Sequence, residues 1–65
     1  MAQYNITATS AKLNTTVSNT NSNFVSPAEF ANKAAADLNA AAYAEDLNHD
    51  DYNGAWDWVG TATTV

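Results

Sequence analysis

The stretch SPAEFANKAAADLNAAAYA, residues 26–44, decides the fold class because it is the one long segment with the features of a helix. Ser26 can cap a helix N-terminus, Pro27 suits the first helical position, and Glu29 stands three residues after the cap; together they form a capping box. We therefore expect a helix from Pro27 to about Glu45, where an acidic residue would return to the apolar face. That face is expected to contain Phe30, Ala31, Ala34, Leu38, Ala41 and Ala42.

The chain upstream of this helix alternates between apolar and polar residues, as half-buried strands do. Residues 3–8 place Tyr4, Ile6 and Ala8 on one face, and residues 11–17 alternate in the same way. The second segment is also rich in threonine, which favours a strand. We expect two strands here.

Downstream of the helix, Asn53-Gly54 marks a turn, and residues 55–65 alternate as a final strand. Trp56 and Trp58 share one face of it, and one or both are expected to complete the core. The polar residues 18–23 are expected to form a loop. The order β-β-α-β predicts an α+β fold, a small three-stranded antiparallel sheet with one helix packed on a face, in a single domain.

Composition argues against several classes of function. The chain has no cysteine and one histidine, so it lacks the ligands of a structural zinc site, and no cofactor is expected. Its net charge of −5 argues against direct binding of nucleic acid or of anionic membranes. No apolar run approaches the roughly 20 residues of a membrane span. The N-terminus has no signal-peptide features, so we expect a cytoplasmic location.

The acidic stretch EDLNHDDYNGAWDW, residues 45–58, has an interpretation as a calcium loop. Counted from Asp46, oxygen-bearing residues fall at loop positions 1, 3, 5 and 12, namely Asp46, Asn48, Asp50 and Asp57. This spacing resembles the EF-hand loop, and the dockerin type more closely. The stretch departs from that pattern at Asp51, where a glycine is needed for the sharp turn, and a strand rather than a helix is expected to follow.

A catalytic interpretation of the same stretch has less support. His49 beside Asp46, Asp50 and Asp51 could act as a base with orienting carboxylates. However, no serine or cysteine stands at a recognisable spacing, there is no glycine-rich phosphate loop, and the chain is too short to enclose a useful pocket. We expect no enzymatic activity.

The distribution of charge favours an interaction surface. Residues 1–28 contain no acidic residue, whereas residues 34–65 contain six and no lysine or arginine. Carboxylates near a helix C-terminus are electrostatically unfavourable, which indicates a role outside folding; net charge for solubility is the simpler explanation. A row of carboxylates resembles nucleic-acid phosphates and would attract a basic DNA-binding surface. The expected partner-binding residues are Glu29, Asp37, Glu45, Asp46, Asp50, Asp51 and Asp57, with Tyr52 as an aromatic anchor.

In size, acidity, lack of cysteine and the carboxylate run EDLNHDDYNGAWD, the chain resembles small anti-CRISPR and anti-restriction proteins of bacteriophages. Several of these are compact acidic α/β folds that act as DNA mimics. The resemblance implies a monomeric or homodimeric inhibitor in the host cytoplasm. Its implied partner is a defence complex with a basic DNA site, such as a CRISPR surveillance complex.

Two alternatives remain open. One is a small structural or accessory phage protein whose Asn/Thr-rich residues 5–23 add a strand to a neighbouring subunit. The other is the calcium-binding module.

Overall fold

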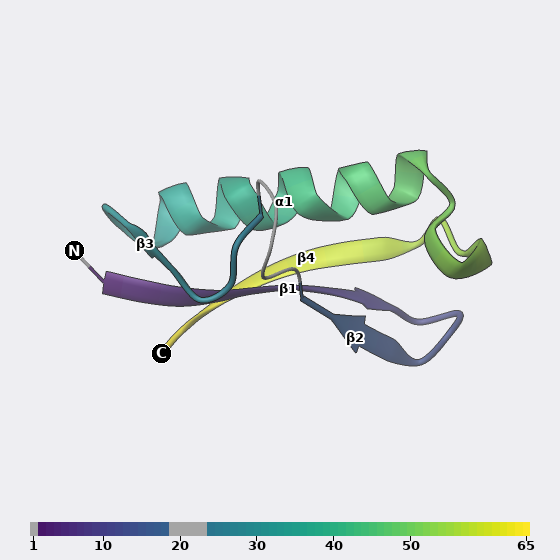
Figure 1. Ribbon diagram of the computed structural model, residues 1–65, viewed down its shortest axis with the longest axis horizontal. Helices are drawn as coiled ribbons and strands as arrows, with labels where there is room; N and C mark the ends of the chain where they lie inside the picture. Colours follow the sequence, from purple (N-terminus) through teal and green to yellow (C-terminus); the bar gives the residue numbers. More distant parts are fainter. Residues whose placement is uncertain (1, 19–23) are drawn as a thin grey trace.

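A computed structural model describes residues 2–18 and 24–65, and it has one helix packed on an antiparallel sheet (Figure 1). The α+β fold class is therefore as predicted. The elements follow in the order β1 (Ala2–Ser10), β2 (Thr15–Val17), β3 (Ala28–Phe30), α1 (Lys33–His49), the 3-10 turn η1 (Tyr52–Gly54) and β4 (Trp58–Thr64). The loop predicted for residues 18–23 lies outside the described residues except for Ser18.

Strand β1 is the centre of the sheet and has neighbours on both edges. β4 pairs along one edge, from Tyr4 opposite Thr64 to Ser10 opposite Trp58. β2 and β3 share the other edge, one at each end of β1. The sheet thus has one more strand than predicted. Because β1 is paired on both sides, strand addition by the N-terminal half would have to use β2, whose other edge has no partner among the described residues.

The predicted start of the helix is wrong, and the fourth strand is the reason. Residues 28–30 pair with β1 instead of forming a helical turn. The hydroxyl of Ser26 is buried and accepts a hydrogen bond of 2.8 Å from the backbone N–H of Ile6, so it fills the gap between β2 and β3. The helix is capped instead by Asn32, whose side-chain oxygen accepts from the N–H of Ala35 at 2.9 Å.

Two other predicted strands are shorter than expected. Residues 11–14 form a turn closed by the N–H of Asn14 on the carbonyl of Ala11 at 3.3 Å, and Asn14 adopts a φ of 52°. Only Thr15–Val17 of the second segment pairs with β1. The last strand begins at Trp58 rather than at residue 55.

The helix buries a different face from the one predicted. Leu38, which was expected to carry packing, is 74% exposed. The helix also continues past Glu45 to His49, because Glu45 lies on its exposed side. The buried positions are Ala36, Ala40, Tyr43, Ala44 and Leu47. They pack against the predicted inner face of β1 and against Ala55, Trp58 and Ala62.

Gly60 of β4 sets the distance between the helix and the sheet. A Cβ atom at this position would overlap the carbonyl group of Ala40 in α1. The helix can therefore approach the strand only because position 60 has no side chain. Within the described residues, no helix is long and apolar enough to cross a membrane.

Candidate functional site

Four exposed carboxylates lie together where α1 ends. Glu45 and Asp46 stand on its last turns, Asp50 caps its C-terminus, and Asp51 follows directly. We call this set, Glu45, Asp46, Asp50 and Asp51, the acidic end. It brings together four of the seven acidic residues predicted to bind a partner.

The turn after the helix holds the acidic end in place. Asp51 adopts a left-handed conformation with a φ of 49°, and its N–H donates to the carbonyl of Asn48 at 3.2 Å. Asn53 at φ 55° and Gly54 at φ 80° continue the reversal toward β4. Asp, Asn and Gly are the residues that tolerate this region best, so the local sequence accounts for the tight turn.

No lysine or arginine neutralises the acidic end. The chain has only two such residues, Lys12 and Lys33. Lys33 pairs with Asp37 at 2.6 Å, one helical turn further on. Lys12 lies 4.4 Å from the centre of the Trp56 ring and donates to the carbonyl of Gly54 at 3.2 Å. Among the described residues, only His49 offers a nearby counter-charge when protonated, with Nδ1 3.7 Å from a carboxylate oxygen of Asp50.

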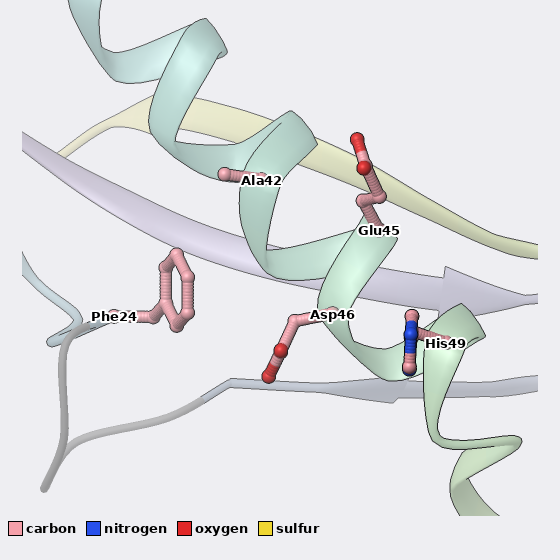
Figure 2. A pocket seen from close by; sticks show the side chains of 5 residues that line it. All are labelled: Phe24, Ala42, Glu45, Asp46 and His49. Atoms are coloured by element: carbon pink, nitrogen blue, oxygen red, sulfur yellow. The ribbon is translucent and has the colours of Figure 1, made fainter.

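A shallow hollow of about 260 Å³ lies beside the acidic end (Figure 2). The ring of Phe24 and the methyl group of Ala42 form its apolar part, and Glu45, Asp46 and His49 form its polar part. Phe24 stacks on Tyr43 with ring centres 5.5 Å apart. Burial, with a smaller effect of Tyr52, raises the pKa of Tyr43 and keeps its hydroxyl neutral. The combination suits the aliphatic stem and charged tip of a lysine or arginine.

Phe24 was not among the predicted site residues. It follows the polar segment 18–23 and carries no periodic pattern that would place it beside a helix that begins nine residues further on. Only the folded chain brings it to the acidic end.

The other predicted partner-binding carboxylates lie elsewhere. Glu29 is on β3, at the opposite end of the molecule from η1 (Figure 1). Asp37 is near the start of α1 and is paired with Lys33. Asp57 accepts hydrogen bonds from the Ser10 hydroxyl at 2.6 Å and from the Lys12 N–H at 2.8 Å. These two hydrogen bonds lower the pKa of Asp57. They also join the β1–β2 turn to the residue that precedes β4.

The residues of the proposed calcium loop do not converge. Asp46 and Asn48 lie inside the helix instead of a loop. The side-chain amide of Asn48 forms two hydrogen bonds with the backbone of Trp58. Its oxygen accepts from the Trp58 N–H at 2.7 Å, and its nitrogen donates to the Trp58 carbonyl at 3.0 Å. No group of three or more His, Cys, Asp or Glu side chains within residues 2–18 and 24–65 could hold a metal ion.

The two tryptophans have different roles. Trp58 is buried, and its indole N–H donates to the carbonyl of Tyr52 at 3.3 Å. Trp56 is 65% exposed beside Lys12. Tyr52 packs on Trp58 with ring centres 5.7 Å apart and keeps 42% of its surface exposed next to Asp51, as an aromatic anchor requires.

Comparisons with protein-family models, with curated proteins and with solved structures found no match for this chain.

Proposed function

We propose that this protein is an acidic inhibitor that binds the basic, nucleic-acid-binding surface of a host defence complex and blocks it by charge mimicry. The observation that carries the proposal is the acidic end: four exposed carboxylates that form no ion pair with either lysine of the chain. CRISPR surveillance complexes are the class of target that the sequence resemblance implies.

Helix electrostatics support a role for these carboxylates outside folding. The last turn of a helix carries partial negative charge, so each nearby carboxylate costs about 0.3–1 kcal/mol. The fold does not recover this cost through ion pairs with lysine or arginine. A basic partner would recover it, and attraction between opposite charges would speed association at low salt.

The surroundings of the acidic end add specificity to charge. The hollow lined by Phe24 could take one lysine or arginine side chain of the partner, with its stem on the ring and its tip at Asp46, which lies on the same side of the helix as Phe24 (Figure 2). Tyr52 adds an exposed ring on the same end of the molecule. Aromatic residues of this kind contribute much of the binding energy at protein interfaces.

The test is a pull-down with the tagged chain from lysate that contains defence complexes, at low and high salt and with excess duplex DNA. We expect a nucleic-acid-binding partner that both salt and DNA displace. The double variant Asp46→Asn, Asp50→Asn should lose this partner. The control variant Glu29→Gln, Asp37→Asn carries the same net charge, −5 + 2 = −3, but leaves the acidic end intact and should retain it.

The neutralised variant should also be more stable than the wild type, because it removes two charges from a helix C-terminus. Loss of binding would then not be explained by unfolding. A partner that is insensitive to salt, to DNA and to the Asp46, Asp50 variant would refute charge mimicry.

A further inference from the structure

The edge of β4 that faces away from β1 has unpaired backbone groups. In an antiparallel pair, alternate residues direct both N–H and C=O toward the neighbour and the others direct them away. The N–H of Val65 donates to the carbonyl of Gln3, whereas the N–H of Ile6 points to Ser26 on the far side of β1. The odd-numbered residues of β4 therefore bond to β1. The outward-directed residues are Trp58, Gly60, Ala62 and Thr64.

Among the described residues, only the first of these four, Trp58, has a hydrogen-bonding partner on this side. Asn48 bonds both backbone groups of Trp58 with its side-chain amide, as a neighbouring strand would. No other described element pairs with this edge. Gly60, Ala62 and Thr64 therefore form an open segment that begins where the Asn48 amide ends.

This open edge lacks the usual protection against pairing. Exposed edges are commonly blocked by lysine, proline, a bulge or an inward-pointing charge. Residues 58–65 contain no proline and no charged residue. Residues 60–64 themselves thus offer no block to an added strand, and Glu45 of α1 is the charged residue that lies beside this edge.

The helix restricts what kind of strand can be added. α1 lies so close to Gly60 that a side chain there would overlap it, so we expect small side chains to suit the helix-facing side of an added strand. An open hollow of about 420 Å³ lies at this edge, lined by Ala41, Ala44 and Gly60 together with the polar Glu45 and Asn48. β4 has small residues on that same side, Gly60, Ala62 and Thr64, so it meets the requirement that its own edge imposes.

We infer that the open edge of β4 pairs with β4 of a second copy of this chain, so that two sheets join into one. An antiparallel register about a two-fold axis at Ala62 sets Gly60 opposite Thr64 of the second copy, and all three outward residues are paired. Thr64 of the second copy then faces the hollow beside Gly60. Each copy fills the other's hollow in the same way.

In each copy, α1 extends away from the two-fold axis in the direction of its C-terminus. Ala40 stands over Gly60 and Asn48 reaches Trp58, so α1 moves away from Ala62 toward its C-terminus. The N-terminal half of each helix, as far as Ala40, lies nearest the axis, and the Lys33–Asp37 pair there balances its own charge. Of the acidic end, Glu45 lines the hollow that Thr64 of the second copy faces, whereas Asp46, Asp50 and Asp51 do not line it. This inference does not depend on the proposed function.

The two associations have opposite salt dependence. Two copies of net charge −5 repel each other, so screening should strengthen the dimer, whereas it should weaken a complex with a basic partner. We expect sedimentation velocity to show a monomer at micromolar concentration and a dimer toward about 1 mM, with a several-fold tighter Kd in high salt, since the interface is small.

Amide hydrogen exchange tests the register. In the dimer, the amides of Gly60, Ala62 and Thr64 should exchange about tenfold more slowly at high than at low concentration. Those of Thr61 and Thr63, which already bond to β1, should show no such dependence on concentration.

Thr64→Pro should abolish the dimer and leave the fold intact, because the N–H that it removes points away from β1. Thr63→Ala, on the opposite face of the same strand, is the matched control and should dimerise normally. N-methylation of the Ala62 amide in a synthetic chain is a second block at the axis, with circular dichroism as the check on folding. The inference is overturned by a monomer at about 1 mM in high salt, by a dimer that survives both blocks, or by protection of these amides only when another protein is added.

Discussion

Replacement of Gly60 by alanine should destabilise the fold strongly. Its effect on the unfolded chain alone, which alanine makes less flexible, would be to stabilise the fold. Gly60 does not have a positive φ, so alanine can adopt its conformation. In such positions Gly→Ala normally stabilises a protein by about 0.4–1 kcal/mol, because it restricts the unfolded chain. Here the new methyl group would overlap the carbonyl of Ala40.

The magnitude follows from what the methyl group meets. Overpacking a core costs about 1–3 kcal/mol when side chains can rotate away. The carbonyl of Ala40 is backbone and cannot rotate, so the whole helix must move off the sheet and loosen the contacts of Ala36 and Ala44 as well. We therefore expect a cost of about 3 kcal/mol or more. A chain of this length has a total stability of only about 3–10 kcal/mol.

Urea unfolding followed by circular dichroism measures the effect. With an m value near ~1 kcal/mol/M, the midpoint should fall by about 3 M, and the Tm should fall by roughly 12 °C or more. Thr61→Ala, the next residue on the exposed face, is the control and should stay within about 0.5 kcal/mol of the wild type. A Gly60→Ala variant as stable as the wild type would refute the close approach of helix and strand.

Three further substitutions test the contacts that replace the predicted ones. Asn32→Ala should cost about 1 kcal/mol in urea unfolding, because it removes the true helix cap. Asn48→Ala should cost about 1–3 kcal/mol, because it leaves the backbone groups of Trp58 without their partner, and amide exchange at Trp58 should quicken. Asp57→Asn should weaken the pH dependence of stability: hydrogen bonds lower the folded-state pKa of Asp57, so its contribution is present above the ordinary value of 3.8 and is lost as pH falls through the folded-state pKa. Urea midpoints of wild type and variant should therefore converge in acid and differ most at neutral pH.

The strand β1 was predictable because its inner residues contrast sharply with their neighbours. Tyr4, Ile6 and Ala8 are all buried, and polar residues separate them. The helix face was not predictable, because alanine occurs all round α1 and gives almost no contrast between its sides. The single leucine that seemed to mark the apolar face, Leu38, points to solvent, whereas the buried Leu47 lies beyond the predicted end of the helix.

The predicted helix start is wrong because a local capping pattern competes with strand pairing to residues far away in the sequence. Ser26, Pro27 and Glu29 satisfy the rules for a capping box, but the strand pairing of residues 28–30 with β1 depends on residues more than twenty positions away. Local propensity cannot anticipate such a partner. The capping rule itself holds six residues later, where Asn32 has no strand to join.

The composition of the acidic stretch was visible in the sequence, but the division of its members between folding and binding was not. Asp57 looks like its neighbours, yet it accepts two hydrogen bonds that join the β1–β2 turn to β4. Asn48 looks like a calcium ligand, yet its amide completes the edge of β4. A tryptophan or Tyr52 could be marked in advance as an anchor on condition that it is exposed, and both Tyr52 and Trp56 are exposed.

Because the residues that stabilise the fold are separate from the acidic end, substitutions at the acidic end need not weaken the fold. The core consists of apolar side chains and two buried serines, and none of the four carboxylates of the acidic end contributes to it. Their loss should therefore raise stability rather than lower it. Solubility alone would be served equally well by carboxylates placed anywhere on the surface, including the first turn of α1, where the helix dipole favours them but which contains none. Their concentration at the one helix end that disfavours them is the observation on which the proposed partner rests.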